Sequence, residues 1–119
     1  MQVRRKPFHG NKFATLYDYD CRGMIDLAIH PEARDEYETA IEWYQKQSAP
    51  AAARFIAEVD TAIKAICHQP DRYTRVDDTH HCYLLDKFPY FVAYRFTREW
   101  VTVVAVRHTS RDQSGWTER

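Results

Sequence analysis

The sequence predicts an α+β fold in which a helical hairpin packs on a small, mostly antiparallel sheet, with the element order β-α-α-β-β-β. Two observations lead to this prediction. Apolar residues recur at helical spacing through two adjacent segments, about residues 31–47 and 49–68, and each segment has a proline in its first turn. Three short runs rich in valine and aromatic residues follow with few residues between them, which is typical of antiparallel strands.

The composition fits one globular domain. A chain of 119 residues that is 45% hydrophobic and 14% aromatic buries enough apolar surface to fold. Because 17 basic residues balance 17 acidic residues, the chain as a whole has no net attraction to nucleic acid or to an anionic membrane. The acidic residues concentrate in one part: residues 24–68 contain eight acidic and four basic side chains.

The first 23 residues lack both helical and strand periodicity and contain two of the three glycines. We therefore expect residues 1–23 to form an irregular N-terminal arm ahead of a folded domain at residues 24–119. Met24 offers an alternative start of translation to Met1. The run MIDLAIH at 24–30 alternates as a short strand does, and it ends where Pro31 interrupts the pattern.

The two predicted helices have recognisable ends. Pro31 opens the first helix, acidic residues follow in its first turn, and it ends near Gln47. Ser48 caps the second helix, which reaches about His68 before Pro70. So short a loop makes the pair an antiparallel hairpin. The apolar faces consist of Ala33, Tyr37, Ala40, Ile41 and Tyr44 in the first helix and Ala52, Phe55, Ile56, Val59, Ile63 and Ile66 in the second.

The remaining strands are expected at Cys82–Asp86, Pro89–Phe96 and Trp100–Arg107. Only three residues separate the last two runs, which predicts an antiparallel hairpin. Both runs are apolar on both faces and should form the centre of the sheet. The core is predicted to bring one set of residues on the second helix against one face of the last strand: Phe55, Ile56, Val59 and Ile63 against Val101, Val103 and Ala105, or against the alternate set.

The cysteines and the hydropathy indicate a cytoplasmic protein without membrane association. Cys21, Cys67 and Cys82 are an odd set without a repeated spacing, which argues against a secreted disulfide scaffold. No stretch approaches the roughly 18 apolar residues of a membrane span. His68, His80 and His81, near Cys67 and Cys82, match no standard zinc spacing, so we expect neither a metal nor another cofactor.

Five segments together resemble the RelE/ParE superfamily of bacterial toxins from type II toxin-antitoxin, or plasmid stabilisation, modules. They are HPEARDEYETAIEWY, SAPAAARFIAEVDTAIKAI, QPDRY, LLDKFPYFVAYR and VVAVRHTSRDQSGW, in the family's order, and they cover roughly residues 24–116. The resemblance implies two helices against a small antiparallel sheet and a cognate antitoxin as partner. It also implies one of two targets, mRNA on the ribosome for RelE-like members or DNA gyrase for ParE-like members, and a homodimer or a toxin-antitoxin heterotetramer as possible assemblies.

The RelE-like catalytic positions are mostly changed in this chain. RelE-like enzymes place lysines on one strand, an arginine on the next, and an arginine and a tyrosine in the C-terminal segment. The strand positions correspond here to Leu84, Asp86 and Phe91, only Arg111 matches, and Trp116 stands near the tyrosine. A site without these cations and this phenol is poorly suited to cleave RNA.

Three interpretations therefore remain open. In the favoured one the protein is ParE-like and inhibits gyrase by binding, with Arg107, Arg111 and Trp116 as candidate binding residues. In the second it is a RelE-like endoribonuclease with a reduced site, in which His108 is the base and Arg111 holds phosphate. In the third it is an inactive relative that only binds the antitoxin. In each case Trp116 is expected to pack the C-terminal segment onto the body of the domain.

Overall fold

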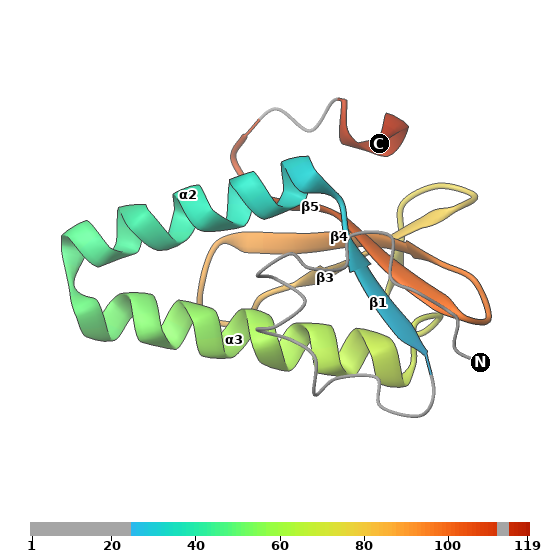
Figure 1. Cartoon of the computed structure of the whole chain (residues 1–119), viewed down its shortest axis with the longest axis horizontal. Coiled ribbons are helices and arrows are strands. Elements are labelled where there is room, and N and C mark those ends of the chain that lie inside the picture. Colours follow the sequence, from blue (N-terminus) through green and yellow to red (C-terminus); the bar gives the residue numbers. More distant parts are fainter. Residues whose placement is uncertain (1–24, 112–114) are drawn as a thin grey trace.

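Two long helices lie on one face of a five-stranded sheet (Figure 1). The computed structural model describes residues 25–111 and 115–119; the predicted arm at residues 1–23 lies outside them. The elements are β1 (Asp26–Ile29), α2 (Pro31–Gln47), α3 (Ala49–His68), β2 (Thr74–Arg75), β3 (His80–Leu84), β4 (Tyr90–Phe96), β5 (Trp100–His108) and the short 3₁₀ helix η1 (Trp116–Glu118). The predicted fold class is confirmed.

The hairpin of α2 and α3 turns on a single residue, Ser48. Its backbone N–H donates to the carbonyl of Tyr44 at 2.9 Å and so closes α2, while its hydroxyl accepts from the N–H of Ala51 at 3.0 Å and opens α3. Both predicted helix ranges are confirmed. In Figure 1 the tip of this hairpin projects beyond the ends of the strands.

The strand order is β1-β5-β4-β3-β2, with β1 parallel to β5 and the other pairs antiparallel. The prediction missed β2, a two-residue strand without an apolar pattern that is antiparallel to β3. It also placed β3 two residues too late. β3 ends at Leu84, and Asp86 and Lys87 lie in the following turn, where the carboxylate of Glu58 accepts both of their backbone N–H groups.

The core between helices and sheet contains Phe55, Val59 and Ile63, each at most 2% exposed, whereas Ile56 is only partly buried. Of the two strand faces that the sequence left open, the one with Val101 and Val103 faces these helices. Ala105 does not, because a register shift pairs Ala93 with Ala105 but Tyr94 with Val103, which leaves Val104 as an extra residue on β5. The bulge moves Ala105 to the face opposite the helices, here called the back face, together with Phe91, Ala93, Val104 and Trp116.

Candidate functional site

The residues singled out in the C-terminal segment do not form one cluster. His108 and Arg111 line a groove on the helix side of the sheet. Arg107 is held in an ion pair with α2, and Trp116 is buried on the back face. A site that combines all four side chains is therefore absent from the described structure, and each environment has its own role.

Arg107 belongs to an ionic cluster centred on Glu36 of α2. One carboxylate oxygen of Glu36 accepts from Arg107 Nε at 3.1 Å and from Arg119 at 2.9 Å, and the other accepts from the backbone N–H of Val106 at 3.0 Å. The side chains of Glu36, Arg107 and Arg119 are only 16%, 11% and 10% exposed. Burial acts to raise the pKa of Glu36, but hydrogen bonds from Arg119, Val106 and Arg107 outweigh it and lower this pKa.

This cluster supplies hydrogen-bond partners to backbone groups at an open edge of the sheet. β1 pairs with β5 only as far as Val103, so the polar backbone groups beyond that point lack a strand partner. Glu36 takes the N–H of Val106, and Arg119 donates to the carbonyl of Val104 at 2.9 Å. Arg107 and Arg119 thus hold the fold together at this edge.

His108 has a partly buried, hydrogen-bonded ring. Its Nδ1 accepts from the backbone N–H of Ser110 at 3.0 Å and lies 2.8 Å from the Ser110 hydroxyl. Its ring stands edge-on to Tyr90, with centroids 5.2 Å apart. Because Nδ1 is an acceptor, the neutral ring carries its proton on Nε2. Arg111 follows in a turn in which its N–H donates to the carbonyl of His108 at 3.1 Å.

The groove that contains His108 and Arg111 has a volume of about 650 Å³. It lies between α2 and the part of the sheet where β4 begins and β5 ends. It is lined by Asp35, Glu36, Thr39, Ala40, Trp43, Tyr44, Pro89, Tyr90, Val106, His108 and Arg111. The sequence-based selection missed the wall formed by α2. A signal was present in Trp43, a large aromatic residue off the predicted apolar face, whose side chain is 54% exposed.

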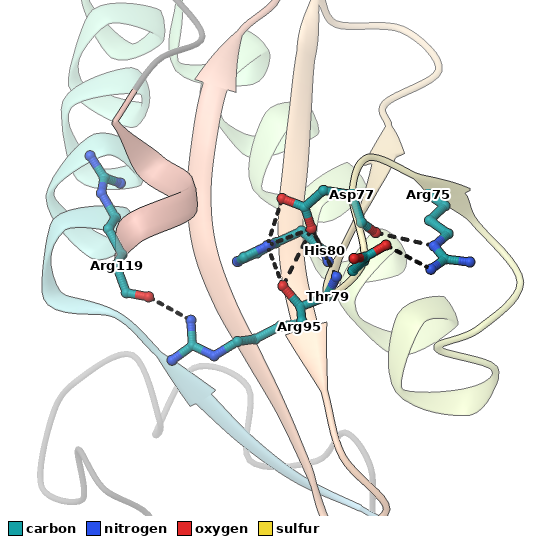
Figure 2. Close-up of polar contacts among 7 residues, drawn as sticks. Arg75, Asp77, Thr79, His80, Arg95 and Arg119 are labelled. Carbon is teal, nitrogen blue, oxygen red and sulfur yellow. Dashed lines mark hydrogen bonds and ion pairs between the residues drawn. The ribbon is translucent and has the colours of Figure 1, made fainter.

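Trp116 packs the C-terminal segment against the back face, as expected. It is 4% exposed, with its ring centroid 5.5 Å from that of His80 and 6.2 Å from that of Phe91. The main-chain carbonyl of Arg119 accepts from Arg95 at 2.7 Å (Figure 2). Trp116 therefore closes the small apolar cluster on this face.

Asp77 and His80 organise the turn between β2 and β3 (Figure 2). One oxygen of Asp77 accepts from the N–H groups of Thr79 at 2.9 Å and His80 at 2.8 Å and lies 3.0 Å from His80 Nδ1. The N–H of Thr79 is the largest cause of a pKa of about 2 for Asp77, followed by the His80 side chain. Arg75 pairs with Asp78 at 3.4 Å on the same turn. These contacts give Asp77 and Asp78 the turn role that aspartate often has.

The metal-ligand types noted in the sequence are dispersed. His80 turns toward Asp77, while His81 stacks on Tyr94 on the other face of β3. Cys82 is a free thiol, whereas Cys67 is disulfide-bonded. Within residues 25–111 and 115–119 no group of three or more His, Cys, Asp or Glu side chains is placed to hold a metal ion.

The positions that carry strand cations in RelE-like enzymes correspond here to an exposed leucine, a buried phenylalanine and an aspartate in a turn. Leu84 projects from β3 with 64% of its area exposed, and Phe91, its partner on β4, packs against Trp116. Asp86 lies in the turn held by Glu58. Leu84 and Phe91 thus present hydrocarbon where RNA cleavage would need fixed positive charge.

These features define a small α+β protein with a groove beside its first long helix and a C-terminal segment clamped on the back of its sheet. The family profile described as "ParE toxin of type II toxin-antitoxin system, parDE" matches residues 27–113. The chain therefore belongs to the ParE toxin family of type II toxin-antitoxin systems.

A solved structure agrees with this assignment at the level of the fold. A chain from the "Chromosomal ParDE TA system from P. aeruginosa" is similar with a TM-score of 0.62 over 71% of this chain and 96% of that chain, at 11% sequence identity. No curated protein matches the sequence. Neither of the long helices in the described segments is long and apolar enough to cross a membrane.

Proposed function

We propose that this ParE-family chain inhibits DNA gyrase by binding it, and that a cognate antitoxin encoded beside it neutralises this activity. The observation that carries binding over RNA cleavage is the apolar back face at Leu84 and Phe91. Cleavage through a 2′-hydroxyl needs a base, an acid and fixed cations around the phosphorane. The strand positions that supply cations in RelE-like enzymes do not supply them here.

The nearby arginines support the same proposal. Arg107 and Arg119 share the carboxylate of Glu36, and Arg95 donates to the carbonyl of Arg119. A guanidinium already paired with a buried carboxylate is a weak candidate for phosphate binding, because releasing it leaves that carboxylate uncompensated. Arg111 is exposed in the turn after β5, and its position there makes it the proposed contact with the target.

The groove beside α2 is the proposed antitoxin site. It combines an exposed tryptophan, Trp43, with the partly buried rings of Tyr44 and Tyr90, and such surfaces on small proteins commonly mark partner contacts. A segment that binds only the folded toxin stabilises it by mass action. We therefore expect the toxin to melt at a higher temperature with saturating antitoxin than alone.

Two target assays test the proposal. The purified protein, with and without the product of the adjacent reading frame, is added to a gyrase supercoiling assay and to a ribosome-dependent mRNA cleavage assay. We expect inhibition of supercoiling that the antitoxin relieves, and intact mRNA. Arg111→Ala should weaken gyrase inhibition more than His108→Ala, because a binding surface depends on charge and shape rather than on a base near neutral pH.

The opposite pattern would identify an enzyme. Cleavage of ribosome-bound mRNA that follows the titration of a histidine and disappears in His108→Ala would replace this proposal with the RelE-like alternative. Normal supercoiling and intact mRNA, together with tight antitoxin binding, would leave the inactive antitoxin-binding relative.

A further inference from the structure

The groove beside α2 has two chemically different ends. Asp35, Thr39 and Trp43 line it at intervals of four residues, so they form one row along the helix. With a rise of about 1.5 Å per residue, Asp35 and Trp43 are about 12 Å apart along the axis. The row runs from a carboxylate at one end to an indole at the other.

Asp35 is the uncompensated charge at its end. The adjacent Glu36 is neutralised by Arg107 and Arg119. Asp35 is exposed, and no side chain in the described part of the protein pairs with it. A cation of a bound partner would therefore meet a carboxylate whose charge is still available.

The other end is aromatic. The exposed Trp43 ring packs edge-on against Tyr44 at 5.0 Å between centroids, and Tyr44 lies 6.1 Å from Tyr90 on the opposite wall. Half-exposed tryptophan and tyrosine at the rim of a hollow are the residue types that dominate binding energy in protein interfaces. This end suits an apolar anchor.

Resting on the proposed antitoxin function, we infer that the groove binds the antitoxin in one direction, with a lysine or arginine at Asp35 and an apolar side chain between Trp43 and Tyr90. The separation of about 12 Å corresponds to three or four residues of an extended segment or to about two turns of a helix. Residues 24–68, with eight acidic and four basic side chains, favour a basic protein segment here and disfavour nucleic acid.

The test uses the full chain and the product of the adjacent reading frame, with affinity measured by calorimetry. Binding to the wild-type chain comes first, because its absence refutes the proposed function and this inference together. Asp35→Lys is then compared with Glu38→Lys, which makes the same charge change on an exposed residue of α2 that does not line the groove. We expect a loss of about tenfold or more for Asp35→Lys and less than about threefold for Glu38→Lys.

The aromatic end has its own matched pair. Trp43→Ala should lower the affinity by about tenfold or more, and Val76→Ala, which truncates an exposed hydrophobic residue outside the groove, should leave it unchanged. Thermal melts of all four variants show that they remain folded.

A charge exchange tests the direction. Each lysine and arginine of the antitoxin is changed to glutamate in turn, and one of these variants should restore tight binding to Asp35→Lys while binding the wild-type chain poorly. Equal losses for Asp35→Lys and Glu38→Lys, or no restoring variant, would refute the inference. Normal antitoxin binding by Asp35→Lys with lost gyrase inhibition would assign the groove to the target instead.

Discussion

Glu36 accepts hydrogen bonds from β5 and from the C-terminal segment while belonging to α2. Its two arginine partners are themselves about 10% exposed, so the carboxylate compensates two largely buried cations. Loss of the Glu36 carboxylate should therefore lower the stability of the fold, because removing one member of a buried ion pair costs more than the pair itself contributes.

We predict that Glu36→Gln lowers the free energy of unfolding by about 2–3 kcal/mol at neutral pH, because Arg107 and Arg119 lose a shared anion. Urea unfolding of the two proteins measures this difference. The control is Glu38→Gln, on an exposed residue of the same helix, which should change stability by less than about 0.5 kcal/mol.

The pH dependence of this difference has a definite sign. The pKa of Glu36 is lower in the folded protein than its usual value of 4.5. Its contribution is therefore complete above about pH 5 and is lost as the pH falls through 4.5 and then through the folded-state pKa. The difference between wild type and Glu36→Gln should shrink over this acidic range, and a constant difference would show that charge is not its cause.

At the scale of elements, the reversal between α2 and α3 depends on Ser48. This one extended residue ends α2 and caps α3, so there is no longer loop between the two helices that could change its conformation. The α2 side of this hairpin forms one wall of the groove. The angle between α2 and α3, which is set at Ser48, therefore contributes to the width of the groove.

We predict that Ser48→Ala destabilises the protein by about 1 kcal/mol, because the N–H of Ala51 loses its acceptor. Thr61→Ala serves as the control, since the Thr61 hydroxyl donates to the carbonyl of Ala57 on the exposed side of α3 and caps nothing. Chemical denaturation should show a clear loss for Ser48→Ala and a change near zero for Thr61→Ala. Equal effects would mean that the cap contributes little here.

At the scale of the molecule, an aromatic cluster joins the helical hairpin to the β3–β4 turn. Phe55 lies at its centre, fully buried, with ring centroids 5.0 Å from Tyr44, 5.3 Å from Phe88 and 5.1 Å from Tyr90. Tyr44 and Tyr90 also line the groove, so the core and the proposed binding surface share side chains.

We predict that Phe55→Ala costs about 3–5 kcal/mol of stability, because it leaves a cavity at this junction. Leu84→Ala removes a side chain that is 64% exposed and should cost less than about 0.5 kcal/mol. Calorimetric melts of both variants measure the contrast. A loss below about 1 kcal/mol for Phe55→Ala would contradict the observed packing.

Residue patterns were enough to predict the two helices, the order of the main strands along the chain and the family resemblance. Helix ends follow from local signals such as Pro31 and Ser48, whose hydrogen bonds and φ preferences act within a few residues. The same holds for the alternation that places Val101 and Val103 together on one face of the last strand. Such features are local, and a linear sequence therefore displays them directly.

Residue patterns did not predict the position of Ala105, the partners of Arg107 or the shape of the groove, because these depend on contacts between distant parts of the chain. Strand alternation predicts a face only while the register is constant, and the extra residue at Val104 breaks it. Likewise, Arg107 and Arg119 meet Glu36 across 71 and 83 positions of the chain. The groove brings Asp35 and Trp43 opposite Tyr90 and His108, because it is made by packing α2 against a hairpin distant in sequence, and no local pattern specifies that contact.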